Sequence, residues 1–175
     1  MKHPLAQFVH CPKCGSAHFV INNDKSKLCK DCDFVYYFNP SAATVAVIIN
    51  AKGELLVCER ARNPAKGTYD LPGGFVDVGE TGEEAIQREV FEEVGLEVVE
   101  ASYLFSIPNT YLYSGFLVHT LDLFYLCSIK SCKNVLAQDD VSDAKFIALE
   151  NIDPQCFGLS SIQMGVKRLL EEKMI

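Results

Sequence analysis

The chain has 175 residues, of which 49% are hydrophobic and 22% are charged, and its formal net charge is −7. This length suits one ordinary domain with a small addition, and the hydrophobic content argues against long disorder. The acidic balance argues against a general nucleic-acid binder, which needs a basic surface. No apolar leader and no membrane-length apolar run are visible, so we expect no membrane span and a cytoplasmic location.

Two pairs of cysteines lie near the start of the chain, as Cys11-Pro-Lys-Cys14 and Cys29-Lys-Asp-Cys32. Matched pairs of this kind suit a tetrahedral Zn²⁺ site, and four thiolates leave no open position for catalysis. Two disulfides or a redox pair are the alternatives, and they fit less well in a chain without an export signal. We therefore predict a small zinc ribbon over residues 1–40, in which structural Zn²⁺ supplies the folding energy.

Pro40 and Ser41 mark the expected boundary to a second domain over residues 41–175. Its first predicted elements are a buried strand at 43–49 and a second strand at 54–59, which pair as a hairpin across a turn. In the loop that follows, Arg60 is a tentative ligand for a substrate phosphate, because a guanidinium pairs well with phosphate oxygens. Arg62, Lys66 and plain solvated loop charge remain alternatives.

A helix is predicted directly after Leu71-Pro-Gly-Gly74. Thr81 with Glu84 three residues later indicates a capping box at its start, and Gly95 indicates a left-handed residue at its end. An apolar stripe of Ile86, Val90 and Val94 would face the core. The two glycines before the helix would let the backbone approach a ligand closely.

Seven carboxylates crowd around this helix and the loop before it, with Arg88 as the only base between residues 74 and 96. Glu89, Glu92 and Glu93 share one helix face. Carboxylates this close repel each other unless protons or cations intervene. Mg²⁺ prefers oxygen ligands and commonly bridges phosphate groups, so the segment indicates phosphate chemistry.

The same segment resembles the signature of the Nudix hydrolases, G-x(5)-E-x(7)-R-E-U-x-E-E-x-G-U, where U is aliphatic. The nine specified positions are filled without departure by Gly74, Glu80, Arg88, Glu89, Val90, Glu92, Glu93, Gly95 and Leu96. The resemblance implies an α+β fold, an α/β/α sandwich with a mixed sheet. It also implies hydrolysis of the phosphoanhydride in a nucleoside diphosphate that is linked to another group. An acidic solvated helix without this function is the alternative.

Residue roles follow from the resemblance alone. It implies that Glu89 and Glu93 bind Mg²⁺ or Mn²⁺ directly and that Glu92 helps as ligand or base. It implies that the Gly73–Gly74 backbone offers a carbonyl, and that Arg88 pairs with Glu80 to hold the junction between loop and helix. Divalent ions at this place would neutralise the diphosphate and activate a water molecule.

Beyond the helix we predict strands at 97–107, 109–113, 116–129 and 144–149, and a final helix that Ser160 or Ser161 caps. Asp139 and Asp140 lie in a polar loop before the last strand. Many Nudix enzymes recruit an extra acid from such a loop, so either could be a further metal ligand or base. An exposed acidic loop is the alternative.

A zinc ribbon ahead of the signature is similar to the NADH pyrophosphatases. That group carries S-Q-P-W-P-F-P-x-S after the signature, whereas this chain reads Ser106-Ile-Pro-Asn-Thr-Tyr-Leu-Tyr-Ser114. NADH, ADP-ribose or a related dinucleotide is the expected substrate class, and a capped RNA and a homodimer remain open. The alternative function is a ligand-sensing, RNA-binding or partner-binding module without significant turnover.

Overall fold

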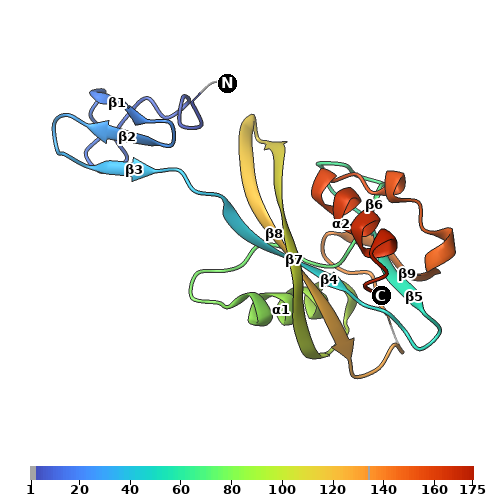
Figure 1. The fold of residues 1–175 in the computed structure, drawn as a ribbon. Helices are drawn as coiled ribbons and strands as arrows, with labels where there is room; N and C mark the ends of the chain where they lie inside the picture. The colour runs from blue at the N-terminus through green and yellow to red at the C-terminus, as the bar shows by residue number, and fades with distance from the viewer. Residues whose placement is uncertain (1–2, 134) are drawn as a thin grey trace. The chain divides into compact units, whose positions relative to one another are not determined.

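The computed structural model describes residues 3–133 and 135–175, and the chain divides into two compact units after Pro40 (Figure 1). In the described residues of the smaller unit, three short antiparallel strands form one sheet in the order β1-β2-β3. Its buried apolar cluster consists of Cys11, Phe19 and Cys29, with Cys32 and Phe34 packed against it. The strands are β1 (Phe19–Asn23), β2 (Ser26–Cys29) and β3 (Val35–Tyr37).

The described residues of the larger unit, Ser41–Ile175, form two three-stranded sheets, of which one is mixed. In the order β4-β8-β7, β4 runs parallel to β8 and β7 runs antiparallel to it, while β6-β5-β9 is antiparallel. The elements are β4 (Ser41–Val47), β5 (Glu54–Arg60), β6 (Tyr69–Asp70), α1 (Gly82–Val94), β7 (Val98–Tyr113), β8 (Phe116–Ile129), β9 (Val141–Ala148), the 3-10 helices η1 (Leu149–Asn151) and η2 (Pro154–Cys156), and α2 (Ser160–Glu171).

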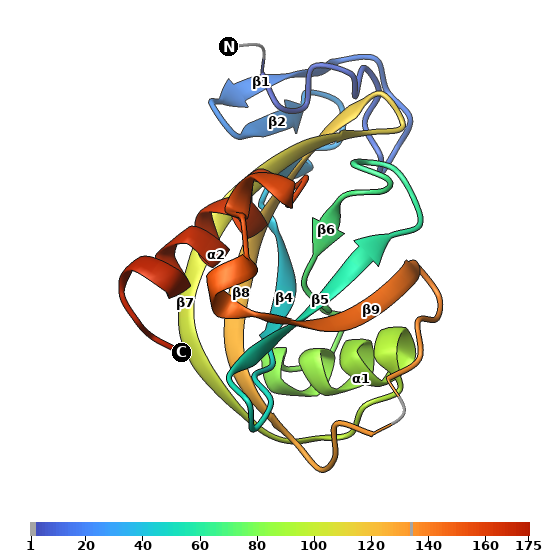
Figure 2. The ribbon, with the colours of Figure 1, turned by 90° about the vertical axis from the view of Figure 1, so that its right-hand side faces the viewer.

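The strands lie between the two helices because their buried side chains alternate between two apolar clusters. Val45 and Val47 of β4 pack in the cluster that contains α2, whereas Ala46 and Ile48 pack in the cluster that contains α1. Successive side chains of a strand point to opposite faces, so a strand apolar at every position can fill two cores. Figure 2 shows α1 and α2 on either side of the strands. The predicted α+β fold with a mixed sheet is confirmed.

Strand pairing differs from the prediction at two places. β4 and β5 meet only near the turn, at a bridge between Ile49 and Leu55, and then separate into different sheets. The two strands expected at 97–107 and 109–113 form the single strand β7, which includes Pro108. Proline fits there because β7 is the edge strand of its sheet, where a missing N–H breaks no inner ladder.

The predicted serine cap of the last helix is wrong. α2 has Leu159 at its N-cap and no side-chain cap hydrogen bond. The Ser160 and Ser161 hydroxyls donate instead to side chains of the sheet, at Asn109 and Asp122. Within the described ranges 3–133 and 135–175, no helix is long and apolar enough to cross a membrane.

Candidate active site

Helix α1 begins and ends as the sequence predicts. The Thr81 hydroxyl accepts a hydrogen bond from the Glu84 backbone N–H, and the Glu84 carboxylate accepts one from the Thr81 N–H, which completes the capping box. Gly95 ends the helix with a φ of 66°, in the left-handed region. The apolar stripe Ile86, Val90 and Val94 is fully buried. These local signals therefore fix the orientation of α1 and of its acidic face, which Glu89, Glu92 and Glu93 form.

Arg88 is the cation that the acidic face surrounds. Its guanidinium donates two hydrogen bonds of 2.9 Å to the Glu80 carboxylate, one to each oxygen. It also donates to Glu89 at 2.8 Å, to Glu92 at 3.2 Å and to the Phe75 carbonyl at 3.0 Å. The hydrogen bonds from Arg88 lower the pKa of Glu80 to about 2. The pair thus holds the loop before α1 against the helix.

Glu93 lies on the other side of the acidic face, beside the glycine loop. Its carboxylate accepts a hydrogen bond of 2.9 Å from the Gly73 N–H. Burial, with a smaller contribution from the negative charges of Asp70, Glu89 and Asp140, raises the pKa of Glu93 to about 8, although the hydrogen bond from Gly73 lowers it. Burial also raises the pKa of Glu89, against the hydrogen bond from Arg88. Both carboxylates therefore favour a proton or a bound cation.

Gly73 and Gly74 run close against β4. The Gly74 carbonyl accepts a hydrogen bond of 2.8 Å from the Thr44 N–H. A Cβ at Gly73, which has a φ of +150°, would lie 2.0 Å from the Thr44 carbonyl oxygen, and one at Gly74 would lie 2.5 Å from a Glu89 oxygen. At Gly73 the clash is with backbone, so only glycine fits there, whereas at Gly74 the Glu89 side chain would have to move.

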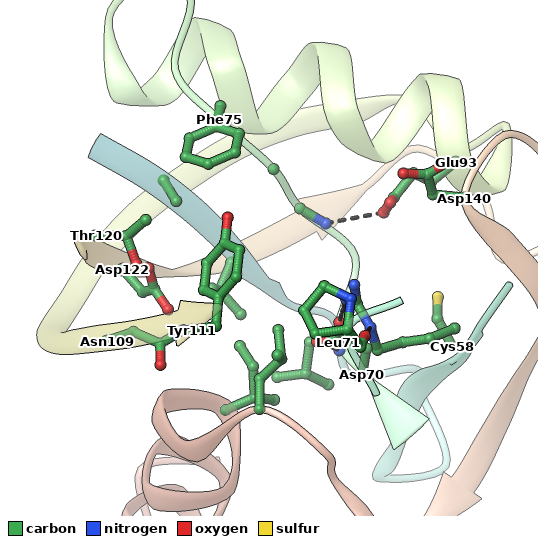
Figure 3. A pocket seen from close by; sticks show the side chains of 18 of the residues that line it. Cys58, Asp70, Leu71, Phe75, Glu93, Asn109, Tyr111, Thr120, Asp122 and Asp140 are labelled. Carbon is green, nitrogen blue, oxygen red and sulfur yellow. Dashed lines mark hydrogen bonds and ion pairs between the residues drawn. The ribbon is translucent and has the colours of Figure 1, made fainter. Parts of the chain in front are cut away.

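A pocket of about 350 Å³ opens beside this loop (Figure 3). Five of the residues predicted for the site line it, and five do not. Those in the lining are Gly73, Gly74, Glu93, Arg60 and Asp140, and those outside it are Glu80, Arg88, Glu89, Glu92 and Asp139. The acidic face of α1 therefore borders the pocket mainly through Glu93 and the glycine loop.

The tentative site residues of the loops each form an ion pair with another residue of the larger unit. Arg60 forms an ion pair with Asp70, which the sequence reading missed, and also donates to the Pro64 carbonyl. Arg62 pairs with Asp140 at 2.8 Å and with Asp139 at 3.8 Å. Burial raises the pKa of Asp70 despite the Arg60 contact. Of the two loop acids, only Asp140 reaches the pocket.

A polar group on β7 and β8 was also missed. Asn109, Thr120 and Asp122 line the pocket and are each 5% exposed or less. Asp122 accepts hydrogen bonds from the Thr120 hydroxyl at 2.6 Å and from the Ser161 hydroxyl. The available signal was a carboxylate in an otherwise apolar strand, Thr120-Leu-Asp-Leu-Phe124, because a buried charge needs partners.

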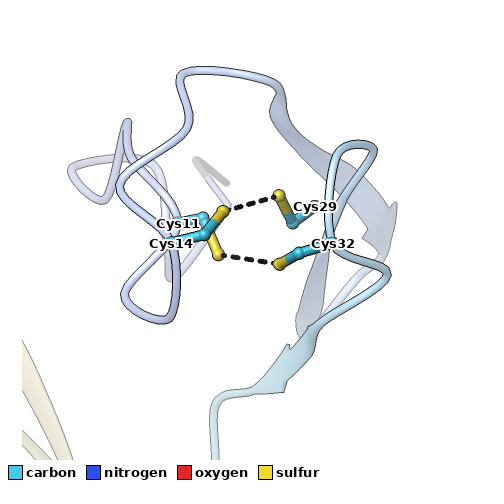
Figure 4. A group of neighbouring side chains, drawn as sticks. All are labelled: Cys11, Cys14, Cys29 and Cys32. Carbon is cyan, nitrogen blue, oxygen red and sulfur yellow. Dashed lines mark hydrogen bonds between the residues drawn. The ribbon is translucent and has the colours of Figure 1, made fainter.

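One group suited to a metal ion exists among residues 3–133 and 135–175, and it is the set of four cysteines in the smaller unit (Figure 4). All four sulfurs lie within 4.8 Å of one another. Cys11 and Cys32 are 3.8 Å apart at sulfur, and Cys14 and Cys29 are 3.6 Å apart. A tetrahedral Zn²⁺ with Zn–S bonds of about 2.3 Å separates its sulfurs by about 3.8 Å, so the thiols fit zinc. These separations are too long for disulfides.

The acidic face of α1 is arranged differently. Arg88 holds Glu89 and Glu92, while Glu93 points to the Gly73 N–H. The structure thus does not bring the three carboxylates to one point. The set consists of oxygens only, and two of its members are raised in pKa by burial, which fits a hard cation.

The sequence model of the NUDIX domain family matches residues 39–164 of this chain. The chain belongs to the NUDIX family. This match extends over most of the larger unit and includes α1, the glycine loop and all residues of the pocket. The family that the sequence resembles is therefore confirmed.

Two kinds of curated protein are similar to this chain. The ADP-ribose pyrophosphatase of Methanocaldococcus jannaschii is 34% identical over 123 residues, which is 69% of this chain and 69% of that protein. The NAD-capped RNA hydrolase NudC of Vibrio cholerae is 27% identical over 144 residues, or 82% of this chain and 51% of that protein. The chain thus spans about half the length of the NudC relatives that it matches.

Solved structures support the same fold. A NUDIX hydrolase from Nitrosomonas europaea superposes with a TM-score of 0.74 at 20% identity, over 94% of this chain and 92% of that one. A MutT NUDIX hydrolase from Burkholderia pseudomallei gives a TM-score of 0.65 at 24% identity, over 75% of this chain and 99% of that one. At these identities the likeness establishes the fold alone.

Proposed function

We propose that this protein is a divalent-metal-dependent pyrophosphohydrolase that cleaves the phosphoanhydride of a nucleoside diphosphate linked to another group. The observation that carries the proposal is Glu93, which lines the pocket, contacts the Gly73 N–H and has a pKa of about 8. A buried carboxylate that favours a cation, beside a glycine loop at the edge of a pocket, suits a metal-bound diphosphate.

The proposed substrate class is ADP-ribose, NADH or a related dinucleotide. The names of the relatives support it, since they are an ADP-ribose pyrophosphatase and NAD-capped RNA hydrolases. The pocket of about 350 Å³ lies at the lower end of the size range for small-molecule sites. A capped RNA is a further candidate, in which the same anhydride would be cleaved at the end of a chain.

The residues proposed as ligands of Mg²⁺ or Mn²⁺ are Glu89 and Glu93. Glu92 is proposed as a further ligand or as a base, and the glycine loop would supply a backbone carbonyl oxygen as a ligand. When bound, such ions neutralise the diphosphate and lower the pKa of an attacking water. Arg88 has two hydrogen bonds to Glu80 in addition to those that it makes to Glu89 and Glu92. It can therefore release the last two carboxylates and still hold the loop to the helix.

We also propose that residues 1–40 form a structural zinc ribbon and that residues 41–175 form the catalytic domain. The sulfur separations of 3.6 and 3.8 Å support the ribbon. Because Cys11 and Cys29 are two of the three buried residues in its apolar cluster, the metal would stabilise the unit directly. A homodimer and a cytoplasmic location remain predictions.

The test is a panel of NADH, ADP-ribose, FAD, coenzyme A, diadenosine polyphosphates and nucleoside triphosphates, incubated with Mg²⁺ or Mn²⁺. Products are identified by mass spectrometry. We expect an adenosine dinucleotide or ADP-ribose to yield AMP and the complementary monophosphate, only when the divalent ion is present. Turnover confined to triphosphates would contradict the proposed substrate class, and no cleavage with either ion would contradict the hydrolase.

One observation favours a second candidate, a ligand-sensing, RNA-binding or partner-binding module without turnover. Arg88 occupies Glu89 and Glu92, so the acids are not gathered for a metal. In that case the panel would show binding of a nucleotide or of RNA without products. Titration calorimetry beside the hydrolysis assay separates the two candidates.

A further inference from the structure

The wall of the pocket formed by β7 and β8 carries a polar group that the proposed metal and phosphate chemistry does not use. Asn109 lies directly opposite Thr120 in the antiparallel pair, and Thr120 donates to Asp122 two residues further along β8. Opposite residues and i, i+2 neighbours share one face of a sheet. In Figure 3, these three residues lie on the opposite side of the pocket from Glu93 and Asp140.

The orientation of the Asn109 amide is fixed by its neighbours. Its oxygen accepts hydrogen bonds from the Thr110 backbone N–H at 2.9 Å and from the Ser160 hydroxyl at 3.0 Å. A backbone N–H can only donate, so the group that faces it must be the oxygen and the opposite group must be the NH₂.

That NH₂ group has no hydrogen-bond partner among residues 3–133 and 135–175, although Asn109 is only 5% exposed. No fully enclosed side-chain nitrogen or oxygen in the described residues lacks a partner. The amide nitrogen is therefore not fully enclosed, and Asn109 lies in the wall of the pocket. A hydrogen-bond donor in the wall of a pocket needs an acceptor from a ligand or from water.

Asp122 offers the complementary chemistry. One of its oxygens accepts from Thr120 and the other from Ser161, yet a carboxylate has about four acceptor positions. Arg60, the basic residue among those that line the pocket, forms an ion pair with Asp70. No ion pair of Asp122 occurs in the described part of the chain. The carboxylate is therefore free to accept N–H donors from the pocket.

We propose that Asn109 and Asp122 form a specificity site that recognises a planar group in which a hydrogen-bond acceptor lies beside an N–H donor. Within the proposed substrate class, on which this inference rests, two groups meet this description. One is adenine, with ring nitrogen N1 beside the exocyclic amino group, and the other is the carboxamide of nicotinamide. Asn109 donates to the acceptor, and Asp122 accepts from the amino group.

The alternative is that this group only anchors α2, since Ser160 and Ser161 lie in the first turn of that helix. Anchoring explains the Asn109 oxygen and two of the acceptor positions of Asp122. It does not explain why the Asn109 NH₂ group has no hydrogen-bond partner in the described residues. Discrimination between ligands is thus the readout that an anchoring role would not change.

The experiment compares three dinucleotides by kcat/KM with Mg²⁺, namely NAD⁺, nicotinamide hypoxanthine dinucleotide and nicotinic acid adenine dinucleotide. Hypoxanthine exchanges donor and acceptor on the base, and nicotinic acid replaces the carboxamide by a carboxylate. A site that hydrogen-bonds one edge should reject the altered analogue by about tenfold or more. Rejection of the first analogue identifies the base as the ligand, and rejection of the second identifies the carboxamide.

The variants are Asn109→Asp, which keeps the oxygen that Thr110 and Ser160 contact but replaces the donor, and Asn109→Ala, in case a second carboxylate near Asp122 prevents folding. Circular dichroism and thermal melting verify the fold of each. We expect the preference to fall below about threefold in either variant. Asn151→Asp, at an exposed position in η1, adds the same charge outside the pocket and should keep the wild-type preference.

Titration calorimetry with Ca²⁺ in place of Mg²⁺ separates this inference from the proposed hydrolase. Hydrolysis without discrimination, or discrimination that both Asn109 variants retain, would overturn the specificity site and leave the hydrolase standing. Binding that discriminates between the dinucleotides, without hydrolysis of any of them, would overturn the hydrolase and leave the specificity site standing. Neither hydrolysis nor binding of any of the three dinucleotides would overturn both.

Discussion

The two units of this chain reach order by different means. The larger unit has two apolar clusters, of twelve and eleven buried residues, on either side of its strands. The smaller unit has a cluster of three, and two of these are the thiols Cys11 and Cys29. A unit of about 40 residues rarely stabilises itself by burial alone and usually needs a metal or disulfides.

The two units therefore place their proposed metal ligands in different surroundings. In the smaller unit the thiols are part of the core, so the proposed zinc and the fold depend on each other. In the larger unit Glu93 and Glu89 lie at the border of a complete core, and burial raises the pKa of both. There the proposed metal would contribute to chemistry, and burial of its carboxylate ligands would reduce the stability of the fold when they are charged.

Removing the zinc ligands should give the largest effect. Cys29→Ser removes a ligand from a fully buried position, and apparent zinc binding energies in such units are about 10 kcal/mol or more. We expect zinc content to fall from about one ion per chain to none, and the NMR signals of residues 3–40 to collapse, while the larger unit keeps its melting temperature. Cys156→Ser, at an exposed cysteine outside the group, is the matched control. A zinc-free wild type would refute the prediction.

Glu93→Gln should change chemistry and leave the fold intact. The amide oxygen of the introduced glutamine can still accept from the Gly73 N–H, but it cannot supply a charged metal ligand. We expect kcat for the best substrate of the panel to fall by about 100-fold or more, with circular dichroism unchanged. Glu97→Gln, at a surface ion pair with Lys130, controls for the lost charge. Equal rates for Glu93→Gln and wild type would remove Glu93 from the site.

Much of this site could be predicted because its signals are local. The Thr81 capping box, the Gly95 end and the apolar stripe of α1 all arise within 15 residues and appear as expected. Strand pairing depends on residues that are far apart in the chain, and local signals do not reveal it. The predicted hairpin of residues 43–49 and 54–59 was therefore wrong, because β4 and β5 enter different sheets.

The polar group on β7 and β8, which forms the proposed specificity site, was missed for the same reason. Asn109, Asp122 and Ser161 come together only through the fold, and the two serines that looked like a helix cap donate across to the sheet. An N-cap hydroxyl must face the first N–H groups of its helix to accept from them, whereas here Ser161 donates to the buried Asp122 carboxylate and Ser160 to the Asn109 amide oxygen.

A substitution at the glycine loop tests how closely this border is packed. A Cβ at Gly73 would lie 2.0 Å from the Thr44 carbonyl oxygen, so Gly73→Ala must displace backbone. We expect a loss of about 3 kcal/mol in the free energy of unfolding, measured by urea denaturation. Gly79 also has a positive φ, +88°, but no atom lies near its Cβ position. Gly79→Ala should therefore lose only about 1 kcal/mol, and equal losses would contradict the packing argument.

In buffer without divalent metal, pH should also change the stability of the larger unit, because the pKa of Glu93 differs between the folded and the unfolded chain. The pKa of Glu93 is about 8 in the folded chain and near 4.5 when unfolded. Below pH 4.5 both states hold the proton, so its contribution to stability is fully present. As pH rises to 8 the unfolded chain releases the proton and the folded chain retains it, so the free energy of unfolding falls. Above pH 8 no further loss occurs.

Glu93→Gln should flatten this slope, and Asp70, whose pKa burial also raises, should leave a residual one. Mg²⁺ should act in the same direction as the substitution, because a bound cation favours the deprotonated carboxylate and so offsets the loss near pH 8. Thermal melting from about pH 5 to 9, with and without Mg²⁺, measures both. Parallel curves for wild type and Glu93→Gln would mean that Glu93 is not strained by burial, and the larger unit would then no longer contrast with the smaller one.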